Sequence, residues 1–204
     1  MILAALALAA AGSASASPPK PLVLAFGDSL TAGYNLERGL GFSPQLEASL
    51  RRHGIAASVA DGGVSGDTTT AGVARLEWTL DGLPRKPDLV ILELGANDML
   101  RTLDPAIPAR NLEIIMTELD RRKIPVLVAG MRATPNLDPT YRTTYDAIFP
   151  ALARRHQAKI YPFFLEGVAG QPGMQQPDGL HPTFAGIKRI VTGILPSVIA
   201  ALKR

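Results

Sequence analysis

The chain of 204 residues contains no cysteine. Disulfide bonds and thiolate metal sites are therefore excluded, and an oxidising compartment poses no problem for this sequence. An excess of one charge is also missing, since the formal net charge of +3 is too small by itself to indicate a nucleic-acid partner. Low-complexity tracts and internal repeats are absent as well. The length and the 47% hydrophobic content indicate one compact domain with a substantial core.

The N-terminal apolar run from Ile2 to Ala11 is shorter than the roughly 20 residues that a membrane span needs. Small residues follow it, and Ala14-Ser15-Ala16 fits a signal-peptidase site ahead of Ser17. No Lys or Arg precedes the run, so a flexible tail is the alternative. We expect residues 1–16 to be a signal peptide and residues 17–204 to form a single domain. The mature protein is then periplasmic or secreted, without stable membrane insertion.

After Lys20, short runs typical of strands alternate with longer amphipathic stretches. This alternation predicts a three-layer α/β fold, in which helices cover both faces of a parallel sheet. The final helix is expected from apolar residues that recur every three or four positions from Ile187 to Leu202, with a possible kink at Pro196. The expected strands are 22–26, 57–60, 89–94, 126–129 and 160–163, and the other expected helices lie near 43–53, 70–80, 106–122 and 141–156.

Small and polar residues follow the first three expected strands. Ser29 follows the first strand, Gly66 lies in a glycine-rich turn after the second, and Asn97 follows the third. In open α/β sheets, binding sites form beyond the carboxyl ends of the strands, so these residues should share one edge. His53 and His156 close predicted helices that run antiparallel to the strands. We therefore expect both histidines at the opposite edge, remote from any chemistry.

His181 is the remaining histidine, and Asp178 lies three residues before it. In a turn, the Asp178 carboxylate could orient the imidazole, as the third member of a serine hydrolase triad does. Alternatively, Asp178 opens a Pro-Asp-Gly turn and His181 caps the final helix, with Pro182 at its first position. The first reading gains support from Ser29 and from three potential oxyanion donors: the N–H groups of Ser29 and Gly66 and the Asn97 amide.

Other site classes lack their sequence features. No G-x-G-x-x-G follows a strand and no G-K-[ST] is present, so dinucleotide and P-loop sites lack their phosphate-binding loops. The G-x-S-x-G elbow of α/β-hydrolases is also absent. Asp28, Asp67 and Asp98 follow turn residues, and no second histidine shares their edge. We expect no metal and no cofactor.

Four segments, FGDSLTAGY, VSGDTT, LGANDML and DGLHP, resemble in order the motif blocks of the GDSL or SGNH hydrolase superfamily. Two longer segments, RATPNLDPTYRTTYDAIFPALARRH and FFLEGVAGQPGMQQPDGLHP, are similar to its arylesterase, acyl-CoA thioesterase I and lysophospholipase L1 branch. The resemblance extends over about residues 21–200.

This resemblance implies a flavodoxin-like five-stranded parallel sheet and a triad of Ser29, Asp178 and His181. It also implies an oxyanion hole made of the Ser29 N–H, the Gly66 N–H and the Asn97 side chain, with no metal. The implied reaction is hydrolysis of aryl esters, acyl esters and acyl thioesters through an acyl-enzyme on Ser29. Asp28 matches a family position, but we interpret it as holding the turn.

Two alternatives remain at this level: a carbohydrate O-deacetylase on the same fold, and a non-catalytic lipid or glycan binder. The segments 99–108 and 131–145 could line an acyl groove, although ordinary packing explains Met99, Leu100 and Leu103 equally well. We expect the partner to be a small-molecule acyl ester or thioester, and we expect a monomer that does not bind nucleic acid.

Overall fold

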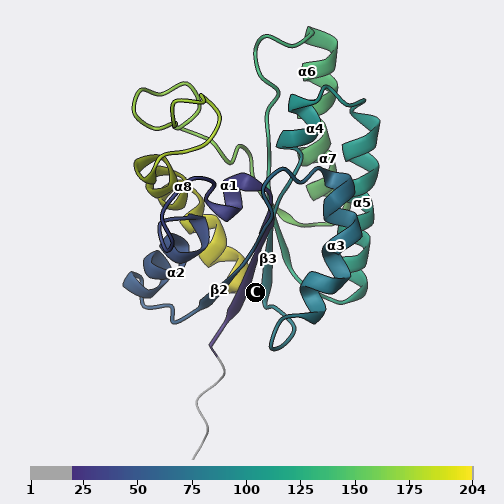
Figure 1. The fold of residues 1–204 in the computed structure, drawn as a ribbon. Coiled ribbons are helices and arrows are strands. Elements are labelled where there is room, and N and C mark those ends of the chain that lie inside the picture. Colours follow the sequence, from purple (N-terminus) through teal and green to yellow (C-terminus); the bar gives the residue numbers. More distant parts are fainter. Residues whose placement is uncertain (1–19, 204) are drawn as a thin grey trace, which may run out of the picture.

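The computed structural model describes residues 20–203. The predicted signal peptide, residues 1–16, lies outside this range and stays a prediction. Five strands form one parallel sheet in the order β2-β1-β3-β4-β5 (Figure 1). The predicted α/β architecture and the five-stranded parallel sheet are therefore confirmed. The strands are β1 (Leu22–Gly27), β2 (Ser58–Gly63), β3 (Leu89–Glu93), β4 (Val126–Ala129) and β5 (Lys159–Tyr161).

Strands β1 and β3 are buried along their whole length, because helices cover them on both sides. The register places Gly27 of β1 opposite both Gly63 of β2 and Glu93 of β3. Three strands thus end at the same level of the sheet. The loops that follow them, which carry Ser29, Gly66 and Asn97, begin side by side at one edge.

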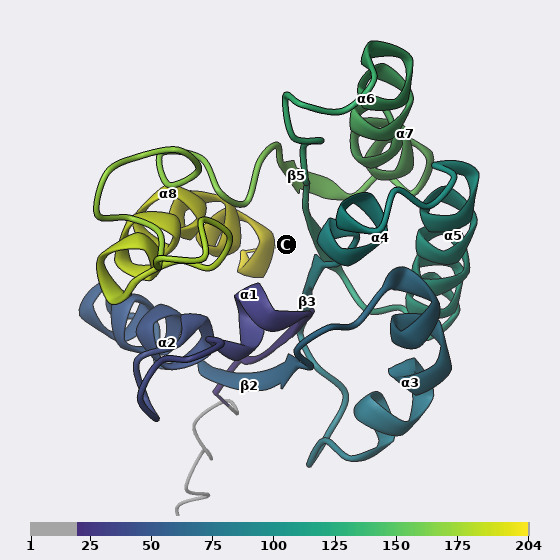
Figure 2. The same ribbon diagram turned by 45° about the horizontal axis from the view of Figure 1, so that its top comes forward.

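Two helical layers enclose the sheet. On one face α2 (Phe42–Arg52) packs against α8 (Phe184–Leu202), and on the other α5 (Ala106–Arg121) packs against both α3 (Thr69–Asp81) and α7 (Ile148–Arg155) (Figures 1 and 2). Three shorter helices, α1 (Ser29–Ala32), α4 (Ala96–Leu100) and α6 (Pro139–Asp146), lie toward the edge where the strands end (Figure 1).

The helix expected near 141–156 is two helices, α6 and α7, that meet at Ala147. Pro150 explains the break, because it has no N–H to donate to the Asp146 carbonyl and its ring crowds that carbonyl. The other expected elements are present, and their ends differ by a few residues from the predicted ones.

Helix α8 is 19 residues long and apolar enough, by length and composition alone, to cross a membrane. Its composition has another explanation in the fold: the stripe of Ile187, Ile190, Ile194 and Val198 is fully buried in the core. The helix packs against α2, β4 and β5. The helix continues through Pro196 as one element, and the kink expected at that residue stays a prediction.

Candidate active site

Ser29 is the first residue of α1, two positions after the end of β1. The Asp28 side chain caps this helix by accepting a hydrogen bond from the Leu30 N–H at 3.0 Å. Gly27 makes the sharp transition possible, since a Cβ there would lie 2.1 Å from Thr31 Oγ1. The strand-to-helix turn thus holds Ser29 at the edge of the sheet, with 8% of its surface exposed. Asp28 holds the turn, as predicted.

The structure brings Ser29, His181 and Asp178 together. His181 Nε2 lies 2.9 Å from Ser29 Oγ, and His181 Nδ1 lies 2.7 Å from Asp178 Oδ2. The other carboxylate oxygen of Asp178 accepts hydrogen bonds from the backbone N–H groups of Leu180 and His181. These bonds, with the one to the His181 side chain foremost, lower the pKa of Asp178 to about 2. The ionised carboxylate therefore faces the imidazole at ordinary pH.

Asp178 combines the two roles that the sequence left open, because it closes the turn and also contacts the imidazole. The alternative role of His181 as a helix cap is wrong. Thr183 caps α8 by accepting from the Gly186 N–H, and the helix begins at Phe184 instead of Pro182. His181 is thereby left with its side chain directed at Ser29.

The loop that carries His181 is fastened to the segment after α1. The Tyr34 ring packs against the His181 imidazole, with 4.3 Å between the ring centroids. Gln176 donates from Nε2 to the carbonyls of Tyr34 and Pro182, and it accepts from Asn35 Nδ2. Sequence reasoning missed Tyr34 and Gln176, because the contacts between these two loops arise only in the folded chain.

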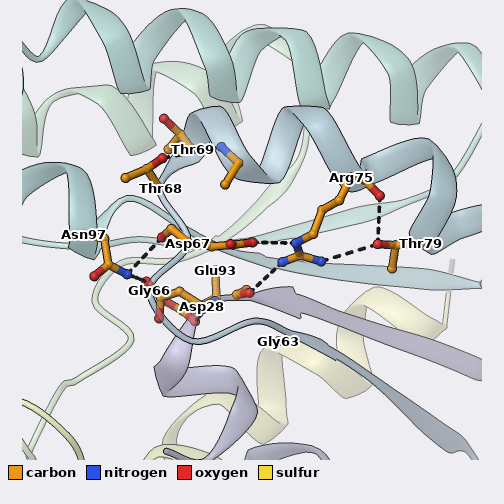
Figure 3. A network of polar contacts seen from close by, with 12 residues as sticks. Asp28, Gly63, Gly66, Asp67, Thr68, Thr69, Arg75, Thr79, Glu93 and Asn97 are labelled. Carbon is orange, nitrogen blue, oxygen red and sulfur yellow. Dashed lines mark hydrogen bonds and ion pairs between the residues drawn. The ribbon is translucent and has the colours of Figure 1, made fainter.

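Asn97 lies near the start of α4, and Figure 3 shows its side chain pointing toward Asp67 and Asp28. Its Nδ2 donates to the Asp67 main-chain oxygen at 2.9 Å and to Asp28 Oδ2 at 3.2 Å. Both amide hydrogens thus have protein acceptors.

Gly66 directly precedes Asp67, in the loop between β2 and α3. Its φ of +87° favours glycine. Apart from its two chain neighbours, none of residues 20–203 has an atom within 4 Å of the position that a Cβ would occupy. Within residues 20–203, neither the Ser29 N–H nor the Gly66 N–H donates to a protein group. Two free backbone donors and one shared amide therefore stand at the edge of the sheet where Ser29 lies.

Two buried carboxyl groups, those of Glu93 and Asp28, lie next to Ser29. Glu93, at the end of β3, accepts from Thr31 Oγ1 at 2.7 Å, and its other oxygen has no partner among the described residues. Burial raises the pKa of Glu93 well above its usual value, and burial raises the pKa of Asp28 to about 7. Sequence reasoning missed Glu93. The signal was its position as the one charged residue of the strand LVILE.

The aspartates weighed as metal ligands have protein partners instead. Asp98 accepts from the Thr69 N–H and hydroxyl at 2.8 and 2.6 Å, which ties α4 to the start of α3. Asp67 pairs with Arg75, and Asp28 caps α1. Residues 20–203 contain no group of three or more His, Asp or Glu side chains arranged to hold a metal ion.

The other two histidines lie at the C-terminal caps of α2 and α7, at the edge opposite Ser29, as predicted. His156 contacts Asp120 through Nδ1 at 2.5 Å and Glu113 through Nε2 at 2.9 Å. His53 contacts the Ser49 carbonyl of its own helix. Both rings are engaged in local contacts, away from Ser29.

Known proteins share this fold and much of this sequence. The GDSL-like Lipase/Acylhydrolase family matches residues 25–189. An arylesterase of Vibrio mimicus is 38% identical over 82% of this chain and 83% of its own length. The thioesterase 1/protease 1/lysophospholipase L1 of Escherichia coli is 32% identical over 78% of this chain and 74% of its own.

Among solved structures, the SGNH-hydrolase family esterase AlinE4 is 49% identical, with a TM-score of 0.78. The alignment covers 91% of this chain and 98% of that one. Fold, motif order and sequence identity thus agree over most of the chain. The chain belongs to the GDSL/SGNH hydrolase family.

Proposed function

We propose that this protein is a serine esterase and thioesterase that hydrolyses aryl and acyl esters and acyl thioesters through an acyl-enzyme on Ser29. The observation that carries the proposal is the continuous contact from Ser29 Oγ through both ring nitrogens of His181 to the Asp178 carboxylate. A binding protein has no need of such a chain, whereas a nucleophilic serine requires a base that is itself oriented.

In the proposed reaction, Ser29 Oγ attacks the acyl carbon while His181 Nε2 takes the hydroxyl proton. Asp178 stabilises the imidazolium that forms. The oxyanion accepts hydrogen bonds from the Ser29 and Gly66 N–H groups and from Asn97. As the intermediate collapses, His181 returns the proton to the leaving alcohol or thiol. Water then attacks the acyl-enzyme with His181 as base, and the acid is released with Ser29 restored.

Exposed apolar side chains support an apolar acyl or aryl substrate. Four of the large exposed hydrophobic residues lie on the segments that carry the candidate site, and each is more than 40% exposed. They are Tyr34, Val64, Leu100 and Leu180. Met99, by contrast, is buried, which favours the packing interpretation for that residue. Exposed apolar side chains around the candidate site suit an acyl chain better than a hydroxyl-rich sugar. The four residues therefore favour the esterase over the carbohydrate deacetylase.

The test is a set of rates on p-nitrophenyl esters from acetate to decanoate, on an acyl-CoA and on an acetylated xylan fragment, with Ser29→Ala as control. We expect turnover of the aryl esters and the acyl-CoA, and none by the variant. Turnover confined to the acetylated sugar supports the deacetylase. Binding of an acyl chain without turnover of any ester supports the non-catalytic binder.

We also propose that the protein is exported and acts as a monomer. The N-terminal sequence pattern supports export. All the candidate catalytic groups lie in one chain, so a single copy suffices for the reaction. Protein recovered from the periplasm or medium should begin near Ser17 by intact mass and elute as one copy in size-exclusion chromatography. A mass that retains Met1 contradicts cleavage of an export signal. Elution as a dimer contradicts the monomer.

A further inference from the structure

Arg75 of α3 is a largely buried cation at the carboxyl edge of the sheet, with 15% of its side chain exposed. Its Nε donates to Asp67 Oδ2 at 2.5 Å, and one terminal nitrogen donates to the Gly27 carbonyl at 2.8 Å. The guanidinium carbon lies 4.1 Å from the centre of the Phe26 ring. Figure 3 shows the side chain reaching from its helix toward Asp67. The triad does not use this residue.

The partners of Arg75 adjoin all three proposed oxyanion donors. The Gly27 carbonyl stands two residues before Ser29 and also accepts from the Val64 N–H. Asp67 directly follows Gly66, and the main-chain oxygen of Asp67 receives the Asn97 amide (Figure 3). The Arg75 guanidinium therefore joins the end of β1 to the loop after β2. That loop in turn holds the Asn97 side chain of α4.

Packing alone does not set the position of the Gly66 loop. In the part of the chain that the structure describes, only the chain neighbours of Gly66 come within 4 Å of where its Cβ would lie, and Val64 in the same loop is 44% exposed. Hydrogen bonds hold the loop, two of them from arginines: Arg75 donates to the Asp67 carboxylate, and Arg101 donates to the Gly66 carbonyl at 3.0 Å. The Val64 N–H on the Gly27 carbonyl and the Asn97 amide on the Asp67 main-chain oxygen add to them. Of these two arginines, Arg75 alone also contacts the strand that delivers Ser29. A planar fork with several N–H donors suits this double contact, which a lysine could not reproduce.

We propose that Arg75 is a positioning residue for the oxyanion hole, which fixes the Gly66 N–H and the Asn97 amide relative to Ser29. This inference rests on the proposed esterase function. Oxyanion donors act when charge develops on the substrate oxygen, so their displacement lowers kcat and leaves KM nearly unchanged. A misplacement of about 1 Å by a distant mutation can cost about 10²-fold in rate.

The first test compares Arg75→Met, which keeps an unbranched apolar stem and removes the guanidinium over Phe26, with Arg75→Lys, which keeps the charge without the fork. On p-nitrophenyl butyrate we expect kcat to fall about 10- to 100-fold for the Met variant and less for the Lys variant, with KM within threefold. A Met variant that folds and keeps kcat within twofold overturns the proposal.

Arg122→Met is the matched control. Arg122 is also a partly buried arginine, 23% exposed, with acidic partners in Glu118 and Asp81, but it lies at the C-terminal end of α5. We expect this variant to lose stability and keep kcat. If Arg122→Met lowers kcat as much as Arg75→Met does, the effect reports general destabilisation and the proposal is wrong.

A double-mutant cycle with Asn97→Ala tests whether Arg75 acts through the oxyanion donors. If it does, the fold-loss of kcat caused by Arg75→Met should be at least three times smaller in the Asn97→Ala background than in the parent. Equal losses in both backgrounds overturn the inference. Should Arg75→Met fail to fold, Asp67→Asn replaces it in the cycle with the same criterion, because it removes the charge and retains the shape. Esterase activity in Ser29→Ala contradicts the proposed function itself. This control therefore distinguishes failure of the proposed function from failure of the inference about Arg75.

Discussion

The Nε2 atom of His181 lies 2.9 Å from the Oγ atom of Ser29, although 152 positions separate the two residues in the chain. Ser29→Ala should therefore abolish ester hydrolysis and leave the fold intact, because the missing hydroxyl makes no contact that the core needs. An organophosphonate should label the parent at Ser29 with one group per chain, as measured by peptide mass spectrometry. Labelling at Ser65, the serine of the segment VSGDTT just before Gly66, contradicts the assignment.

Asp178→Asn should lower kcat by up to about 10⁴, because the amide cannot stabilise the imidazolium or hold the tautomer in the same way. The pKa of Asp178, about 2, means that this carboxylate does not titrate in the working range. A general base must be unprotonated to accept the Ser29 proton, so kcat/KM of the parent should decline toward acid pH without a contribution from Asp178. A parent profile that stays flat down to about pH 4 contradicts a histidine base.

Asn97→Ala should lower kcat about 10²- to 10³-fold with little change in KM, as removal of an oxyanion donor does. The contacts of Asn97 with Asp67 and Asp28 add a structural cost, which we expect to be about 1–2 kcal/mol in the free energy of unfolding. Steady-state kinetics and urea unfolding separate the two effects. If kcat of the folded variant stays within tenfold of the parent, Asn97 is scaffolding and the backbone donors suffice.

Glu93→Gln should make stability less dependent on pH. Burial raises the pKa of Glu93 well above the ordinary 4.5, so the folded state keeps a proton that the unfolded chain releases. The free energy of unfolding of the parent therefore falls as pH rises above about 4.5, and the raised pKa of Asp28 acts in the same direction up to about 7. Urea unfolding at pH 5 and pH 8 should show that the free energy of unfolding of the variant increases relative to that of the parent as pH rises. The exposed Glu77→Gln serves as control, and an equal gain there contradicts the assignment.

His156→Ala should lower stability by about 1 kcal/mol and leave kcat within twofold. The ring contacts Asp120 and Glu113 at the edge opposite Ser29, so its loss removes local contacts only. His53→Ala should behave likewise with a smaller loss of stability. Loss of turnover in either variant, measured on an aryl ester at a temperature where both remain folded, contradicts their placement away from the chemistry.

Sequence reasoning could predict what depends on local pattern. The apolar runs that form β1 and β3 are long enough to predict a central sheet, and the residue that follows each strand is visible in the chain. Parallel strands end at a common edge, so Ser29, Gly66 and Asn97 could be expected together before any contact was known. The turn from Asp178 to His181 is local as well, and the direction of the imidazole decides between its two interpretations.

Tertiary structure decided the contacts between distant segments. No periodicity reveals that Arg75 contacts both Gly27 and Asp67, or that Asn97 shares its amide with Asp28. Such contacts depend on the register of neighbouring strands and on the side of the sheet that each helix covers, which the whole core settles jointly. The raised pKa of Glu93 has the same origin, because burial of a carboxyl group is a property of every segment packed around it.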